Sequence, residues 1–209
     1  MSVFLKYFPR LNETQLSQLN DLKKIYKDLN KNVNVISRKS IDNINVFHIL
    51  HSLSINKIIE FKRSTNIMDL GTGGGFPGIP LAILFPEVNF FLVDSIGKKI
   101  KVVNDIANKS NLENIQTLNI RAENIDTKFD FIVSRAVCEM SQFLKIIKSK
   151  LKEDSRHKIN NGLFYLKGGD LYHELKNIPH KSYDISSFYE ERFYSTKKII
   201  YVSKKHINK

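Results

Sequence analysis

The residues best suited to chemistry in this sequence lie in a glycine-rich segment, residues 66–80. A short apolar run at 67–70 predicts a strand, and glycines follow it at once. They are Gly71, Gly73, Gly74 and Gly75. Glycine adopts positive φ angles freely and lets a ligand lie against bare backbone. Because an apolar helix is predicted to begin at residue 78, the segment joins a strand end to a helix start, where open α/β sheets bind their ligands.

The acidic residue Asp69 indicates which ligand the loop would hold. The G-x-G-x-x-G spacing of dinucleotide-binding loops is present at Gly73, Gly75 and Gly78. A carboxylate beside the loop would nevertheless repel a pyrophosphate and attract a cation. S-adenosylmethionine carries an ammonium and a sulfonium charge and no phosphate, so it fits this loop better. A nicotinamide-dependent dehydrogenase is the alternative enzyme class.

Strands and helices are predicted to alternate after the loop. Apolar runs predict strands at 88–93, 115–120, 129–133 and 163–166, and helical spacing predicts helices at 96–107 and 140–151. This pattern predicts an α/β fold with a mostly parallel sheet covered by helices on both faces. Two further strands, at 188–194 and 198–203, have no helix between them, so we expect an antiparallel hairpin at the C-terminal edge of the sheet.

Polar residues close three of the predicted strands at the edge where such sheets bind ligands. Asp94 can accept both ribose hydroxyls of the cofactor, or it caps the following helix. Glu123 or the backbone beside it can contact the adenine edge, or it is a surface carboxylate. Arg135 can hold a phosphate or the methionine carboxylate of the cofactor, or it pairs with Asp130.

Two helices are predicted ahead of the glycine loop. The first begins near Asn12, with Gln15 completing a capping box, and the second covers residues 42–61. We expect residues 1–62 to form an N-terminal helical extension packed on a core domain of residues 63–209. His48 and His51 are three residues apart, but no Cys or further His nearby completes a set of metal ligands, so no metal site is expected.

The charge of the chain indicates a polyanionic partner. The net charge is +12 and the pI is about 9.6, which is typical of nucleic-acid-binding proteins. The candidate RNA-binding residues are Lys23, Lys24, Lys27, Arg38, Lys98, Lys99 and Arg135. A solvated basic face is the alternative interpretation of the lysines.

The remaining composition favours a soluble cytoplasmic monomer that does not contact a membrane. Cys138 is the only cysteine, which excludes an internal disulfide and agrees with a reducing compartment. No apolar run approaches the ~20 residues that cross a bilayer. No basic stretch followed by an apolar core stands at the N-terminus, so no secretory signal is expected.

The segment 69–82, Asp-Leu-Gly-Thr-Gly-Gly-Gly-Phe-Pro-Gly-Ile-Pro-Leu-Ala, resembles the signature of the RsmG/GidB family. Further matching segments follow in the family's order at 86–87, 94–99, 121–123, 134–136 and 166–168. The turn at 32–34 and the His48-x-x-x-Ser52 pattern resemble its N-terminal region, so the similarity spans about residues 15–203. The family consists of bacterial 16S ribosomal RNA guanine-N7 methyltransferases.

The resemblance implies a class I, Rossmann-like methyltransferase fold and S-adenosyl-L-methionine as the cofactor. The residues that match its cofactor-binding positions are Gly71, Phe76, Ala122, Glu123 and Arg135. Together with the residues considered above, the candidate cofactor-binding set is Asp69, Gly71, Gly73, Gly75, Phe76, Asp94, Ala122, Glu123 and Arg135. The chain departs from many relatives in having no Trp before Asn30 and in having His51 where they have Asp.

The resemblance implies methylation of a guanine N7 in 16S ribosomal RNA, either free or within a small-subunit assembly intermediate. Guanine N7 presents a lone pair and carries no proton. The reaction therefore needs placement of the two reactants rather than a general base, and no catalytic acid or base is expected. A non-catalytic RNA-binding factor that retains a relic pocket is the third hypothesis.

Overall fold

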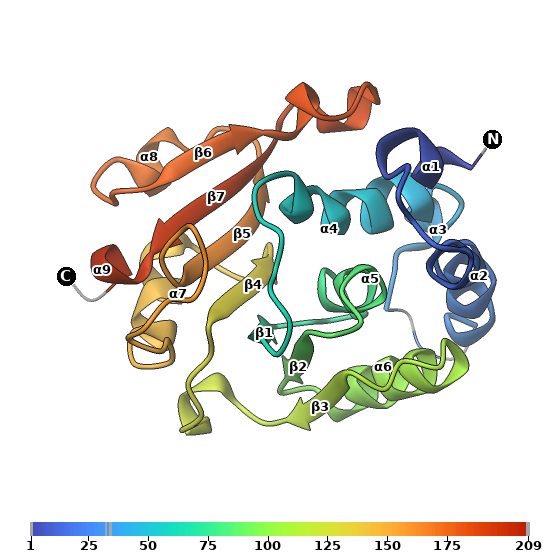
Figure 1. Cartoon of the computed structure of the whole chain (residues 1–209), viewed down its shortest axis with the longest axis horizontal. Helices are drawn as coiled ribbons and strands as arrows, with labels where there is room; N and C mark the ends of the chain where they lie inside the picture. Colours follow the sequence, from blue (N-terminus) through green and yellow to red (C-terminus); the bar gives the residue numbers. More distant parts are fainter. Residues whose placement is uncertain (1, 32, 34, 208–209) are drawn as a thin grey trace.

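A computed structural model of the chain describes residues 2–31, 33 and 35–207. Within that part, seven strands form one sheet in the order β3-β2-β1-β4-β5-β7-β6 (Figure 1). The strands are β1 (Asn66–Leu70), β2 (Asn89–Asp94), β3 (Ile115–Asn119), β4 (Phe131–Arg135), β5 (Gly162–Gly168), β6 (Lys181–Asp184) and β7 (Lys197–Ser203). Strands β1 to β5 are parallel, whereas β7 runs antiparallel to both β5 and β6. The expected mostly parallel α/β sheet is confirmed.

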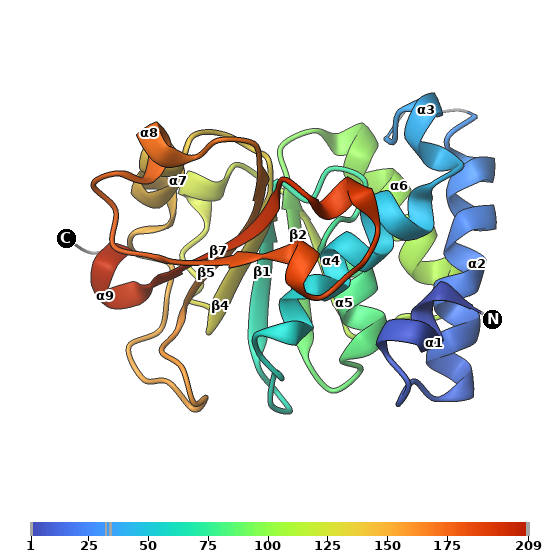
Figure 2. The same cartoon turned by 90° about the horizontal axis from the view of Figure 1, so that it is seen from above.

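Helices cover both faces of this sheet (Figures 1 and 2). On one side lie α1 (Val3–Tyr7), α2 (Glu13–Leu29), α3 (Arg38–Ile41), α4 (His51–Leu53), α5 (Gly78–Leu84) and α6 (Gly97–Lys109). On the other side lie α7 (Met140–Ile147), α8 (Tyr172–Leu175) and α9 (Lys204–Ile207). None of the helices in the described ranges is long and apolar enough to cross a membrane.

The central strands are apolar on both faces because each face is buried under helices. Along β1, Ile67 contributes to the core on the side of the N-terminal helices, and Met68 contributes to the core on the side of α7. The first of these two cores includes buried side chains from α1 and α2 as well as from the sheet. The N-terminal segment therefore packs directly on the sheet layer, and α2 contacts both α5 and α6.

The first of the two predicted helices, α2, begins as expected. The side chain of Asn12 accepts a hydrogen bond from the Gln15 amide, and the Gln15 side chain accepts one from the Asn12 amide, which completes the capping box. The amino-terminal part of the chain is thus positioned by local polar contacts as well as by its apolar face.

The helix predicted for residues 42–61 is confirmed over residues 45–57, but its bounds and its regularity are wrong. The chain forms a π-helical turn, η1 (Asn45–Leu50), then α4, then a 3-10 turn, η2 (Ser54–Lys57), and continues without helix. The hydroxyls of Ser52 and Ser54 donate to the carbonyls of His48 and His51, at 2.7 and 2.6 Å. Such side-chain bonds to helix carbonyls disturb the regular backbone pattern.

The strand predicted for residues 188–194 is also wrong. This segment is irregular and contains the 3-10 turn η5 (Arg192–Tyr194), preceded by η4 (Ile185–Ser187). The aromatic side chains of this segment pack in the core instead of pairing as a strand, and Tyr189 and Tyr194 are buried there. The edge strand that pairs with β7 is β6, whose polar sequence Lys-Ser-Tyr-Asp is typical of an exposed edge.

Candidate active site

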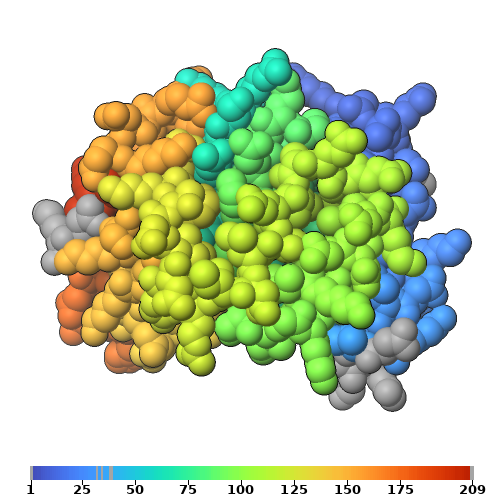
Figure 3. Space-filling model, turned by 90° about the horizontal axis from the view of Figure 1, so that it is seen from below, coloured from blue at the N-terminus to red at the C-terminus, as the bar shows by residue number. Residues whose placement is uncertain are grey.

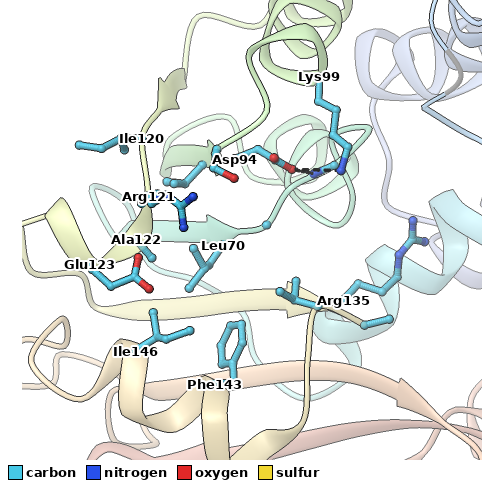
Figure 4. Close-up of a pocket in the computed structure, with 16 residues that line it drawn as sticks. Leu70, Asp94, Lys99, Ile120, Arg121, Ala122, Glu123, Arg135, Phe143 and Ile146 are labelled. Atoms are coloured by element: carbon cyan, nitrogen blue, oxygen red, sulfur yellow. Dashed lines mark hydrogen bonds and ion pairs between the residues drawn. The ribbon is translucent and has the colours of Figure 1, made fainter.

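A cavity of about 500 Å³ opens at the carboxyl ends of the central strands (Figure 4). This volume lies in the range of small-molecule binding sites. Its lining combines backbone of the glycine loop, charged side chains and apolar side chains from α7. The residues are Leu70, Gly71, Gly73, Val93, Asp94, Ser95, Lys99, Ile120, Arg121, Ala122, Glu123, Arg135, Ala136, Val137, Phe143 and Ile146.

The glycine loop is shaped by backbone hydrogen bonds to the neighbouring strand. The amides of Gly71 and Thr72 both donate to the carbonyl of Val93, at 2.9 and 3.0 Å. Gly71 has a φ of 70° and Gly73 has a φ of 58°, values that glycine adopts without strain. A Cβ at Gly71 would lie 2.5 Å from the Val137 side chain, so the close approach also requires glycine.

Asp69 lies below the loop instead of lining the cavity. It is fully buried, and its Oδ2 accepts hydrogen bonds from the Thr72 hydroxyl at 2.7 Å and the Gly78 amide at 2.8 Å. Burial raises the pKa of Asp69 to about 7. The sequence interpretation placed this carboxylate beside the ligand, but the alternation of β1 directs it toward α5. There it fixes both ends of the loop.

Asp94 lies at the rim of the cavity, as expected. Its Oδ2 accepts a hydrogen bond from the Gly73 amide at 3.1 Å, and its Oδ1 accepts one from the Ile96 amide at 2.9 Å. Lys99 approaches Oδ2 at 3.7 Å. The N-cap position of α6 is Ile96, and its side chain makes no capping hydrogen bond. Asp94 therefore shapes the turn that leads into α6 and is not its N-cap. Both carboxylate oxygens therefore hold backbone beside the cavity.

Ala122 and Glu123 also line the cavity, on the 3-10 turn η3 (Ala122–Asn124) after β3. In the space-filling view, the segment from α6 to β4, coloured green to yellow, occupies the middle of one face of the molecule (Figure 3). The apolar side chains of Phe143 and Ile146, from α7, line the cavity beside this turn (Figure 4). The combination of apolar walls and one carboxylate suits a flat heterocycle with polar edges.

Arg135, the last residue of β4, does not pair with Asp130. Asp130 instead pairs with Lys152 at 2.8 Å and accepts a hydrogen bond from the Asn66 amide. The guanidinium of Arg135 lies over the ring of Phe76, with Cζ 4.9 Å from its centroid, and contacts Nδ1 of His48 at 3.0 Å. Burial lowers the pKa of Arg135 to about 10, so the side chain remains cationic at neutral pH.

Phe76 supports Arg135 from the core and does not line the cavity. It is buried, and its ring stacks on Tyr26 of α2 at 4.9 Å. The Tyr26 hydroxyl donates to the Gly74 carbonyl at 2.6 Å. The sequence does not reveal this contact, because helical periodicity indicates burial but not the partner of a hydroxyl. Gly75, with a φ of 91°, also lies away from the cavity lining, close to Ile79.

A second group that the sequence did not reveal fixes the loop after β4. The Tyr165 hydroxyl lies 2.9 Å from the amides of both Val137 and Cys138, and Lys167 donates to the Cys138 carbonyl at 2.8 Å. Both Tyr165 and Lys167 belong to β5. The sequence identified Lys167 only as part of a matching segment, since contacts between neighbouring parallel strands depend on register.

The candidate RNA-binding lysines lie on two helices that pack together, α2 and α6. Lys27 pairs with Asp42 at 2.9 Å, and Lys23 donates to the backbone carbonyl of the same residue. Lys24 and Lys98 are exposed. The Arg38 side chain and residues 32 and 34 of the matching turn lie outside the described part of the chain.

The two histidines occupy different environments. His48 contacts Arg135, whereas His51 is buried against the rings of Phe193 and Tyr194, at 5.8 and 6.2 Å. Burial lowers the pKa of both residues, that of His48 to about 3. Among the residues that the structure describes, no group of three His, Cys, Asp or Glu side chains could hold a metal ion.

Comparison with known proteins identifies the family. The family described as "GidB: rRNA small subunit methyltransferase G" matches residues 15–200. Relatives named ribosomal RNA small subunit methyltransferase G include one from Flavobacterium psychrophilum, 51% identical over 203 residues, with 97% of each chain covered. Another, from Phocaeicola vulgatus, is 51% identical over 205 residues, with 97% of this chain and 98% of the relative covered.

Solved structures support the fold. A SAM-dependent methyltransferase from Aquifex aeolicus has a TM-score of 0.56 at 15% identity, covering 79% of this chain and 98% of that one. A complex of MtNAS with S-adenosylmethionine has a TM-score of 0.57 at 12% identity, covering 91% of this chain and 76% of that one. The fold is therefore the class I methyltransferase fold that the sequence predicts, and the chain belongs to the rRNA small subunit methyltransferase G (GidB) family.

Proposed function

We propose that this chain transfers the methyl group of S-adenosylmethionine to N7 of a guanine in 16S ribosomal RNA. The observation that carries the proposal is the cavity beside the glycine loop, in a chain that matches this methyltransferase family over nearly its whole length. Membership of this family favours a methyltransferase over the nicotinamide-dependent dehydrogenase and over a factor without activity.

The residues of the cavity fit the parts of S-adenosylmethionine. Asp94 offers a carboxylate at the rim for the ribose hydroxyls, and the turn with Ala122 and Glu123 faces apolar walls that suit adenine. Backbone at Gly71 and Gly73 lines the path toward Arg135. We assign Asp69, Gly75 and Phe76 to supporting this site from below, because none of them lines the cavity.

The proposed reaction moves no proton in the transfer step. When bound, S-adenosylmethionine supplies a methyl group activated by its sulfonium. The guanine N7 lone pair forms the new bond to carbon while the sulfur keeps the electrons of the broken bond, so N7 becomes positively charged. The protein's task is to bind and align the two reactants, for which proximity and orientation supply ~7–11 kcal/mol in favourable cases.

The RNA is proposed to approach over the side of the cavity that faces the N-terminal helices. Residues 1–62 act there as a helical extension packed on a methyltransferase domain of residues 63–209. Lys23, Lys24, Lys27, Arg38, Lys98 and Lys99 are the proposed phosphate contacts. The chain is proposed to act as a monomer in the cytoplasm, on 16S ribosomal RNA or a small-subunit assembly intermediate, without contacting a membrane.

Methyl transfer from labelled S-adenosylmethionine tests the proposal directly. Purified protein should label 16S ribosomal RNA taken from cells that lack this chain, and mass spectrometry should locate the label on N7 of one guanine. RNA from cells that contain the chain should accept little label, because the position is already methylated. Absence of labelling with both naked RNA and small subunits would refute the proposal.

A further inference from the structure

The guanidinium of Arg135 is cationic, and within the described part of the chain no carboxylate neutralises it. Among the described residues, none forms an ion pair with it within 4.0 Å. Asp69 influences it only from a distance, and Asp130 is occupied by Lys152. The Arg135 side chain is half-buried, and a cation partly withdrawn from water without a partner is costly to the folded protein. Its environment is therefore suited to an oxyanion that arrives with a ligand.

His48 contacts this guanidinium without neutralising it. The distance from Nη2 of Arg135 to Nδ1 of His48 is 3.0 Å. A guanidinium can only donate hydrogen bonds, so Nδ1 must accept and the imidazole must be neutral. The His48 ring also lies 5.0 Å from the ring of Phe76, on which Arg135 stacks. Together the two rings fix the plane of the guanidinium and leave its charge available.

The backbone that carries His48 is itself held in place. His48 lies in η1, a π-helical turn of the kind often found at functional sites. The Ser52 hydroxyl donates to the His48 carbonyl at 2.7 Å, and the Tyr194 hydroxyl donates to the Val46 carbonyl at 2.5 Å. His51 is on the following turn but packs against Phe193 and Tyr194. His48 is thus directed at Arg135, and His51 provides a matched control.

We propose that His48 is a positioning residue, which holds the Arg135 guanidinium ready for an oxyanion at the side of the cavity facing the N-terminal helices. Figure 4 shows the Arg135 side chain leaving β4 away from Asp94 and Glu123, toward the helical segment before β1. The oxyanion is either the methionine carboxylate of the cofactor or a phosphate of the RNA. A planar guanidinium binds either group through paired hydrogen bonds. This inference rests on the proposed function.

Three variants test the role of His48. His48→Leu keeps the volume but removes the acceptor, and it should lower kcat/KM for methyl transfer to 16S ribosomal RNA at least about tenfold. His48→Asn restores an acceptor near the position of Nδ1 and should recover activity to within about threefold. His51→Leu should also stay within about threefold. Thermal unfolding of each protein corrects these values for the folded fraction.

Binding measurements distinguish the two sources of the oxyanion. If the cofactor carboxylate is the partner, His48→Leu should weaken calorimetric binding of S-adenosylhomocysteine by about tenfold. If an RNA phosphate is the partner, that affinity should stay normal while KM for the RNA rises. Should His48→Leu fail to fold, His48→Gln replaces it, because its longer side chain moves the acceptor.

Two results would overturn the role of His48: normal kinetics and normal S-adenosylhomocysteine binding in His48→Leu, or equal losses in His48→Leu and His48→Asn. A wild-type chain that methylates no RNA would instead refute the proposed function. In that case S-adenosylhomocysteine binding alone decides the inference, and an unchanged affinity in His48→Leu overturns it.

Discussion

The two ends of the cavity are held in contrasting ways. At the Asp94 end, both carboxylate oxygens accept hydrogen bonds from backbone amides, those of Gly73 and Ile96. At the Arg135 end, the guanidinium is held by the side chains of His48 and Phe76. His48 lies 87 residues from Arg135 along the chain, whereas Ile96 is two residues from Asp94.

The two ends of the cavity therefore depend on different parts of the chain being folded. The Asp94 end needs only the glycine loop, β2 and the start of α6, since its contacts come from the amides of Gly73 and Ile96 and from the Lys99 side chain. The Arg135 end needs the segment before β1 to be folded and correctly placed. Mutations should therefore affect the two ends differently. Changes at the Asp94 end should lower cofactor affinity. Changes at the Arg135 end should lower methyl transfer to RNA, and they should also lower cofactor affinity if Arg135 holds the methionine carboxylate.

The largest effect is expected for Asp94→Ala. It removes a charged acceptor proposed for the ribose hydroxyls and also frees the Gly73 amide. Because hydrogen bonds to charged groups contribute ~1.5–3 kcal/mol, S-adenosylmethionine affinity should fall roughly tenfold to a hundredfold. Calorimetry measures this loss. Asp94→Asn, which keeps one oxygen acceptor, should lie between wild type and Asp94→Ala, and unchanged affinity in both variants would remove Asp94 from the site.

Arg135→Lys should lower turnover more than about tenfold while the protein stays folded. Lysine keeps the positive charge but lacks the planar fork that stacks on Phe76 and contacts His48. Single-turnover methyl transfer and thermal unfolding of the same protein measure the two properties. Near-normal turnover would show that the charge alone suffices, and the contrast between the two ends would then lose its main support.

The Asp94 end could be predicted from the sequence because its signals are local. Glycines follow the first predicted strand and Asp94 closes the next one, so the glycine loop and the carboxylate are expected at the same edge of the sheet. The loop, the strands and the position of Asp94 follow from such patterns. The sequence did not show that Asp69 points toward α5 instead of the cavity. The direction of a strand side chain depends on which elements cover each face of the sheet, and a local pattern does not contain that information.

The Arg135 end could be anticipated only in part. The position of Arg135 after β4 follows from the chain order, but its partners come from distant segments whose apolar patterns were ambiguous. Residues 42–61 have a helical pattern, and residues 45–57 are helical, yet serine hydroxyls bond to the helix carbonyls and the backbone changes from π to α to 3-10 along the segment. Residues 188–194 have an aromatic pattern that suits a strand, yet Tyr194 bonds to Val46 instead of pairing in the sheet.

The buried carboxylate of Asp69 predicts a pH effect on stability. Burial raises its pKa from 3.8 to about 7, so between these values the folded chain retains a proton that the unfolded chain has lost. The contribution of Asp69 to folding therefore becomes less favourable as the pH rises through this window. Asp69→Asn keeps an oxygen acceptor for Thr72 and Gly78 but cannot titrate.

The free energy of unfolding of Asp69→Asn relative to wild type should therefore increase from about pH 4 to about pH 7 and remain constant above it. Urea unfolding at several pH values measures this difference. A constant difference across the window would mean that the Asp69 pKa is not raised in the folded chain.

The lysines of α2 test whether RNA reaches the Arg135 end over the N-terminal helices. Replacing Lys23, Lys24 and Lys27 with Gln should make the salt dependence of RNA binding less steep. The slope of the logarithm of the binding constant against the logarithm of the salt concentration should become less negative by up to about 0.9 for each lysine that contacts a phosphate. Replacing Lys145, Lys148 and Lys152 provides the control, because these lysines lie in another basic part of the chain. If the salt dependence became less steep only in the control variant, the RNA would bind a different face of the protein.

The smallest effect is expected for Tyr26→Phe, which tests a hydrogen bond between α2 and the glycine loop. The substitution removes the hydroxyl that donates to Gly74 at 2.6 Å and keeps the ring that stacks on Phe76. A hydrogen bond of this kind contributes about 1 kcal/mol net, so urea unfolding should show a loss of that size. Because the cofactor contacts of the Asp94 end do not involve Tyr26, S-adenosylhomocysteine affinity should change by less than about threefold. If Tyr26→Phe instead weakened that affinity as much as Asp94→Ala, the glycine loop would depend on the N-terminal helix, and the two ends of the cavity would form one cooperative unit.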